Sequence, residues 1–116
     1  MILTNAQMLD SLRILSQVEE KGVLGFAIAQ NRRKLQTEVK EYSDKYDELL
    51  KKHGTDLGDG RVSLPREAVH AFEAELQPYA KMTANVPVTQ VTEEVFCSGN
   101  LTSGQMYVLA WMVKED

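Results

Sequence analysis

The chain has 116 residues, of which 43% are hydrophobic and 26% charged, and this composition is typical of a single globular domain spanning residues 1–116. One cysteine excludes an internal disulfide scaffold and a zinc site built on cysteines. The net charge of −4 argues against a general nucleic-acid binder. No stretch of 18 apolar residues predicts a membrane span, and without a basic, apolar leader we expect a cytoplasmic protein.

A capping box with a hydrophobic staple predicts where the first helix begins. Thr4 is the expected N-cap, and the side chain of Gln7 can reach back to its backbone N–H. Leu3, before the cap, is expected to pack on Met8. Apolar side chains then recur on one helical face, and Gly22 is the expected end of the helix.

A long second helix is the dominant predicted element. It runs from about Leu24 to His53 without proline, and its apolar positions follow an a/d heptad pattern. At about 1.5 Å per residue it is about 45 Å long, more than the roughly 27 Å expected for the diameter of this globule. One end is therefore expected to project, to pack on another subunit, or to break near Gly25. The apolar seam consists of Ile28, Leu35, Val39, Tyr42, Tyr46, Leu49 and His53.

A short hairpin and a third helix are expected next. The Asp59-Gly60 pair is a strong signal for a two-residue β-turn. Pro65 suits the first turn of a helix, because its missing N–H has no partner there anyway. Pro78 is expected to end or kink this helix near Leu76.

The next segment reads as extended. Val86–Phe96 is rich in β-branched residues, and its proline favours an edge strand. Cys97 follows it, and nothing in the sequence places a histidine beside the thiol. We therefore expect Cys97 to be a small buried hydrophobe and not a nucleophile.

The last helix repeats the start of the first. Leu101–Met106 has the spacing of Leu3–Met8, with Thr102 as the N-cap, and a shared capping device explains this better than an internal repeat. Tyr107–Val113 is apolar at every position, so we expect it to be buried on all sides, as the central element or at a subunit interface.

These elements predict a mainly helical α+β fold. A long central helix packs with the N- and C-terminal helices, and a small β-hairpin or edge strand lies at one side. The excess of apolar and aromatic residues favours self-association over one closed core, because Trp and Tyr are enriched in interfaces. The interface candidates are Tyr42, Tyr46, Leu49, Tyr107, Trp111 and Met112.

One basic cluster is a candidate for contact with an anion. Arg32, Arg33 and Lys34 are consecutive, and such residues fan around a helix, so a solvated face explains them better than a phosphate site. An oligomer that binds a small ligand remains an alternative. It would need a pocket between subunits lined by Arg32, Arg33 or Tyr42.

We predict no catalytic residue, no metal and no cofactor. His53 and His70 lie 17 positions apart and do not form the close pair that metal motifs usually contain. The alternative is a small hydrolase-like or metal-dependent enzyme that uses His53, Asp56 and Asp59.

The order of elements resembles that of small phage and prophage proteins of Gram-positive bacteria. The resemblance rests on Phe26–Leu35, on Tyr46–Gly54, on the Asp-Gly ribbon and on the final Leu-x-Trp-Met helix. Gly25 departs from it, because a bulkier residue is usual there. The resemblance implies a phage-encoded protein, in the cytoplasm of the bacterial host, that acts by binding. We expect a non-enzymatic homo-oligomer that serves particle assembly or binds a phage or host protein.

Overall fold

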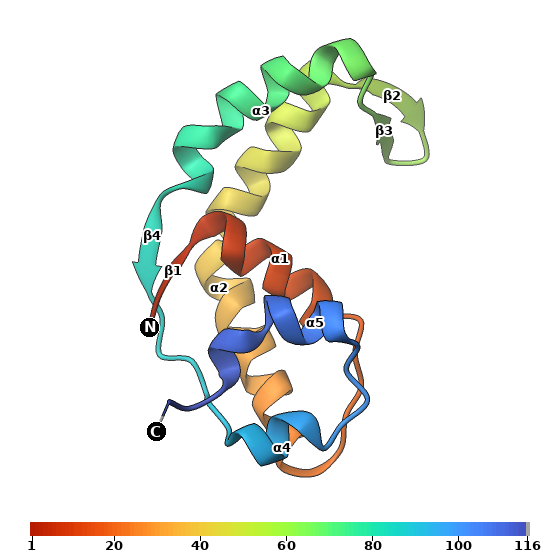
Figure 1. Ribbon diagram of the computed structural model, residues 1–116. Helices are drawn as coiled ribbons and strands as arrows, with labels where there is room; N and C mark the ends of the chain where they lie inside the picture. The colour runs from red at the N-terminus through yellow and green to blue at the C-terminus, as the bar shows by residue number, and fades with distance from the viewer. Residues whose placement is uncertain (116) are drawn as a thin grey trace.

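The computed structural model describes residues 1–115 as a mainly helical α+β fold (Figure 1). It measures 44 × 28 × 23 Å, so its one long helix is as long as the molecule. None of the helices over the described residues has the length and apolar character needed to cross a membrane. In chain order the elements are β1 (Ile2–Thr4), α1 (Asn5–Leu15), α2 (Gly22–His53), β2 (Thr55–Gly58), β3 (Arg61–Ser63), α3 (Arg66–Ala80), β4 (Thr83–Asn85), α4 (Glu93–Cys97), α5 (Ser103–Val108) and the 3-10 helix η1 (Ala110–Met112).

The predicted capping box of α1 is confirmed. Thr4 Oγ1 accepts a hydrogen bond of 3.1 Å from the Gln7 N–H, and Gln7 Oε1 accepts one of 2.8 Å from the Thr4 N–H. The helix ends at Leu15, seven positions before the expected stop. Gly22 instead begins α2 and has a φ of +64°, a conformation that glycine adopts without steric cost.

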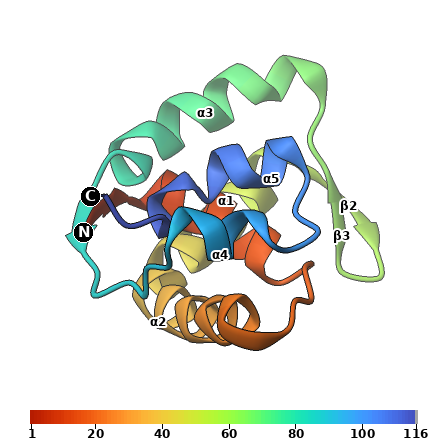
Figure 2. The same ribbon diagram turned by 60° about the horizontal axis from the view of Figure 1, so that its bottom comes forward.

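The long helix α2 is unbroken through Gly25. A Cβ at this position would collide with the carbonyl oxygen of Glu20, so the absence of a side chain lets the preceding turn lie against the helix. The N-terminal part of α2 contacts α1 and α4, and its C-terminal part lies beside α3 (Figures 1 and 2). Its buried side chains are Leu24, Ala27, Ile28, Asn31, Leu35, Val39, Tyr42 and Leu49.

The predicted hairpin is confirmed. Strands β2 and β3 pair antiparallel around Asp59 and Gly60, whose φ values of 54° and 75° fit a turn with two left-handed residues. The hairpin projects from the end of the molecule where α2 and α3 meet (Figure 1). It therefore adds exposed surface and little core.

Helix α3 does not end near Leu76, as predicted, but continues through Pro78 to Ala80. Pro78 has no N–H to donate to the carbonyl of Ala74, but both residues are exposed, so water can take the place of that donor. Phe72 is the buried residue of α3, and its ring meets Tyr46 of α2 edge-on at a centroid distance of 5.3 Å.

The prediction of an extended strand over Val86–Phe96 is wrong for most of its length. The strand lies earlier, at β4, which pairs antiparallel with β1, and within the predicted stretch Val91 forms one isolated bridge to the C-terminal segment. Thr92 caps the short helix α4, because its hydroxyl accepts from a backbone N–H of the first turn. Phe96 is the buried residue of α4, and the neighbouring Cys97 is exposed, contrary to expectation.

A buried asparagine fastens the segment between β4 and α4 to α2. Asn31 is fully buried; its Nδ2 donates to the Thr89 carbonyl at 2.8 Å, and its Oδ1 accepts from the Thr89 N–H at 2.7 Å. These two bonds satisfy backbone groups that a strand partner would otherwise have to satisfy. The irregular path of this segment therefore depends on a side chain far away in sequence.

The predicted N-cap of the last helix, Thr102, is confirmed with a complete capping box. The expectation that the residues after it are buried on all sides is wrong. Leu109 and Met112 are fully buried, but Tyr107 is 85% exposed. The reason is that α5 packs on α1 with one side only, and its other side faces solvent; in Figure 2 it lies over α1, between α3 and α4.

Candidate functional site

Two hollows flank α1, one on each side of Asp10. The first, which we call the tyrosine groove, has a volume of about 330 Å³ and lies between α1, α2 and α3. The second, the tryptophan pocket, has a volume of about 410 Å³ and lies between α1, α5 and η1. Asp10 of α1 lines both. The other residues that line the tryptophan pocket are Gln7, Ser11, Tyr107, Val108 and Trp111.

Trp111 forms one wall of the tryptophan pocket and is held in two places. Its indole Nε1 donates a hydrogen bond of 2.9 Å to the hydroxyl of Ser11, which is 1% exposed. Its backbone carbonyl accepts from Gln90 Nε2 at 3.0 Å. An aromatic ring fixed in this way loses little conformational entropy when a partner covers it.

Tyr107 stands at the same pocket and is the most exposed large hydrophobic residue of the described chain, at 85%. It lies four residues before Trp111, across the turn between α5 and η1. The two sequence-predicted aromatic residues are therefore brought together in one hollow. Tyr and Trp are the residue types most enriched at the centres of protein interfaces.

The charges on α1 divide between the two hollows. Asp10 and Arg13 are 3.9 Å apart, at the outer limit of an ion pair, and both side chains are more than half exposed. The Arg13 guanidinium lies 5.1 Å from the centre of the Tyr46 ring, in the tyrosine groove. Among the described residues that line the tryptophan pocket, Asp10 is therefore the one with a formal charge.

The floor of the tyrosine groove is aromatic. Tyr42 is 6% exposed, and burial raises the pKa of its phenol, with Tyr46 and Asp10 adding to the rise and Arg13 opposing it. The Tyr42 and Tyr46 rings meet edge-on at a centroid distance of 6.4 Å. Tyr42 shares this groove with Arg13, and not with Arg32 or Arg33.

Three of the six interface candidates form part of the chain's own core. Tyr42, Leu49 and Met112 are each at least 94% buried in the single chain, and Tyr46 is half-buried. The heptad seam of α2 is thus covered by α1 and α3. Tyr107 and Trp111 line the tryptophan pocket, whereas Tyr42 and Tyr46 line the tyrosine groove.

The basic cluster on α2 is split by the fold. Lys34 Nζ donates to the Pro87 carbonyl at 2.7 Å and contacts Thr89 Oγ1 at 3.1 Å, so it helps to hold the segment after β4. Arg33 is exposed and Arg32 half-buried. The three cations therefore have different surroundings, as expected for consecutive residues on a helix.

The structure does not bring His53, Asp56 and Asp59 together. His53 Nε2 contacts Glu75 Oε1 of α3 at 3.1 Å. Asp56 Oδ1 accepts from the backbone N–H of Gly58 at 2.8 Å, which closes the local turn of the hairpin. Asp59 is exposed at the hairpin turn. The three side chains therefore have separate surroundings and do not form one site.

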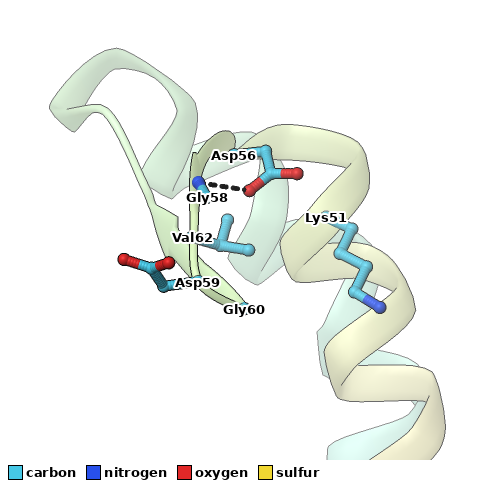
Figure 3. A pocket seen from close by; sticks show the side chains of 6 residues that line it. All are labelled: Lys51, Asp56, Gly58, Asp59, Gly60 and Val62. Carbon is cyan, nitrogen blue, oxygen red and sulfur yellow. Dashed lines mark hydrogen bonds between the residues drawn. The ribbon is translucent and has the colours of Figure 1, made fainter.

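An open notch of about 410 Å³ does lie between the hairpin and the end of α2, and Figure 3 shows its lining. Lys51, Asp56 and Asp59 contribute its charged groups, but their side chains point in different directions and do not converge on one point (Figure 3). Over residues 1–115, no group of three or more His, Cys, Asp or Glu side chains is placed to hold a metal ion. His53 is not among the described residues that line the notch.

Of the six residues that line the tryptophan pocket, the sequence pointed to Tyr107 and Trp111 and not to Gln7, Asp10, Ser11 or Val108 as site residues. A signal for Ser11 was present, because it falls on the same helical face as Met8 and Leu15, both fully buried. A serine inside an apolar face needs a hydrogen-bond partner, and so does the N–H of a partly buried tryptophan. Asp10 carried no comparable signal.

Neither a protein-family model, nor a curated protein, nor a solved structure matches this chain.

Proposed function

We propose that this chain is a non-enzymatic protein-binding protein whose partner docks on the outer face of α1, over the tryptophan pocket. The observation that carries the proposal is the exposure of Tyr107, 85%, beside a tryptophan that the fold holds in place. Covering two aromatic rings on binding is favourable, and such rings dominate binding energy at interfaces. Gln7 and Asp10 supply the polar rim that protein interfaces usually have.

The biological setting belongs to the same proposal. We propose a phage-encoded protein that works in the cytoplasm of a bacterial host, in particle assembly or by binding a host factor. A second copy of the chain is one partner that fits an aromatic face, so self-association is included. The resemblance of the sequence to phage and prophage proteins is what supports this setting.

Site-specific photo-crosslinking tests the proposal. A photoreactive phenylalanine analogue replaces Tyr107 in one variant and Gln36 in a matched control; Gln36 is an exposed residue of α2 that lines neither hollow. Both variants are expressed in a Gram-positive bacterium, with and without phage infection, and irradiated. We expect a discrete adduct from position 107 and none from position 36, because contact is confined to the pocket face.

The mass of the adduct identifies the partner class. An adduct of twice the chain mass indicates a second copy, and light scattering at micromolar concentration must then show more than a monomer. An adduct of another mass identifies a different protein by mass spectrometry. No adduct from position 107 in either condition, or equal adducts from both positions, contradicts the proposal.

A further inference from the structure

We infer that the tryptophan pocket receives an arginine side chain of the partner protein, with the guanidinium against the rings of Trp111 and Tyr107 and paired with the carboxylate of Asp10. This inference rests on the proposed function and specifies the chemistry that the face recognises.

The neighbouring groove contains the same arrangement with its cation in place. On one side of Asp10, the Arg13 guanidinium lies 5.1 Å from the Tyr46 ring centre and 3.9 Å from the Asp10 carboxylate. On the other side, the same carboxylate lies with Tyr107 and Trp111, and no basic residue is among those that line the pocket. The tryptophan pocket thus has an acidic group and two aromatic rings, and its complement is a cation.

The chemistry of the walls selects the kind of cation. Because the Trp111 N–H is used by Ser11, the ring offers an incoming group its π system and apolar surface. A guanidinium is planar, stacks on aromatic rings and pairs with carboxylates, and it is more weakly hydrated than an ammonium. Arginine therefore fits these walls better than lysine does.

The charge of Asp10 is available to such a partner. The Asp10 side chain is 64% exposed, and its separation from Arg13 leaves room for a shorter contact. The whole chain carries a net charge of −4, which favours the approach of a basic surface. Charge complementarity thus points to a partner that presents arginine on an otherwise polar or apolar segment.

The sole tryptophan of the chain makes a direct test possible, because its fluorescence and its single indole N–H resonance both report on this pocket. The protein is titrated with N-acetyl-arginine methylamide and, as a matched control, with the uncharged isostere N-acetyl-citrulline methylamide. We expect a saturable change with the arginine compound. The citrulline compound should bind about tenfold more weakly, because it loses both the ion pair and the cation–π contact.

Two variants locate the binding. Asp10→Asn should weaken binding of the arginine compound about threefold, and Tyr107→Ala should also weaken it. The matched control Glu38→Gln removes an exposed acidic charge on α2 and should leave binding unchanged. N-acetyl-lysine methylamide, titrated in the same way, should bind more weakly than the arginine compound. Equal binding of the arginine and citrulline compounds, tighter binding of the lysine compound, or no effect of Asp10→Asn would overturn the inference.

The two proposals can fail separately. If photo-crosslinking from position 107 yields a specific adduct but the arginine compound does not bind, the partner uses other contacts and this inference falls. If the arginine compound binds with the expected selectivity but no adduct forms, the pocket binds the cation and the proposed protein partner falls.

Discussion

Trp111 and Ser11 are joined by a hydrogen bond of 2.9 Å between residues 100 positions apart in the sequence. Ser11 is 1% exposed and lies at the base of the tryptophan pocket, whose wall the indole forms. One buried oxygen atom thus connects the core of the molecule to the wall of its candidate binding site. The position of that wall should depend on it.

Replacing Ser11 with alanine should therefore affect stability and the pocket together. The change removes the acceptor of the Trp111 N–H, and an unpaired donor near the core costs about 2 kcal/mol. We expect the free energy of unfolding, measured by urea denaturation, to fall by that amount. The tryptophan emission of the folded protein should shift as well. Ser16→Ala, at an exposed serine just after α1, is the control, and equal effects of both changes would contradict the assigned role.

Asn31→Ala should loosen the segment that crosses α2 before α4. The substitution leaves the N–H and the carbonyl of Thr89 without their partner, and we expect a loss of about 3 kcal/mol in the free energy of unfolding. The Thr89 amide of the variant should also exchange with solvent faster than the same amide does in the unchanged protein, as measured by NMR. Gln36→Ala, at an exposed position of the same helix, should change neither quantity. Unchanged exchange at Thr89 would show that the two hydrogen bonds from Asn31 are not needed to hold this segment on α2.

Two glycines in helices should respond to alanine in opposite directions. Gly25→Ala places a Cβ against the backbone of Glu20, and the resulting shift should destabilise the protein by about 1–2 kcal/mol. A methyl group at Gly104 of α5 would point into open space, so Gly104→Ala should stabilise the protein by about 0.5 kcal/mol. Thermal denaturation of the two variants measures both effects. A stabilised Gly25→Ala variant would contradict this prediction, because the backbone at Glu20 would then be able to move away from the added methyl group at no cost.

Acidification should weaken the contact between the C-terminal end of α2 and Glu75 of α3. Hydrogen bonding to Lys52 lowers the pKa of Glu75 from its usual 4.5, with His53 contributing in the same direction. A lowered pKa in the folded state means that the carboxylate stabilises the fold above pH 4.5, and that this contribution is lost as the pH falls through the folded pKa.

The comparison of Glu75→Gln with the unchanged protein tests this pH dependence. Urea denaturation between about pH 3 and pH 7 should show a smaller loss of stability on acidification in the variant, because glutamine does not titrate. Carboxyl resonances measured by NMR should place the Glu75 midpoint below 4.5. Parallel stability curves for the two proteins would refute the assignment.

Features that depend on a few adjacent residues could be predicted from the sequence. The caps at Thr4 and Thr102 and the turn at Asp59-Gly60 are confirmed because each is satisfied by groups within four positions. The long helix was likewise predictable from its period and its lack of proline. The mainly helical α+β fold followed from these elements.

Features set by distant contacts could not be predicted in the same way. The β-branched residues of Val86–Phe96 favour a strand, but Asn31, 58 positions away, binds the backbone of Thr89 and holds this part of the chain in an irregular path. Thr92, which caps α4, is a local signal that the strand prediction did not use. The apolar run that begins at Tyr107 suggests complete burial, yet pattern alone does not say how many sides of a segment have neighbours. The sequence indicated the aromatic residues of the pocket but not Asp10. Asp10 becomes part of the pocket only because α5 packs beside α1, and the sequence pattern does not give that placement.

Helix α2 also sets the order in which the molecule can be completed as the chain leaves the ribosome. Its C-terminal half is covered by α3, which follows after a short hairpin, so this end can fold soon after it is synthesised. The other end needs α5 and η1, which are synthesised much later, to cover α1. The surface proposed to bind a partner therefore forms after the contact between α2 and α3, and a nascent chain can engage that partner only once α5 and η1 have been synthesised.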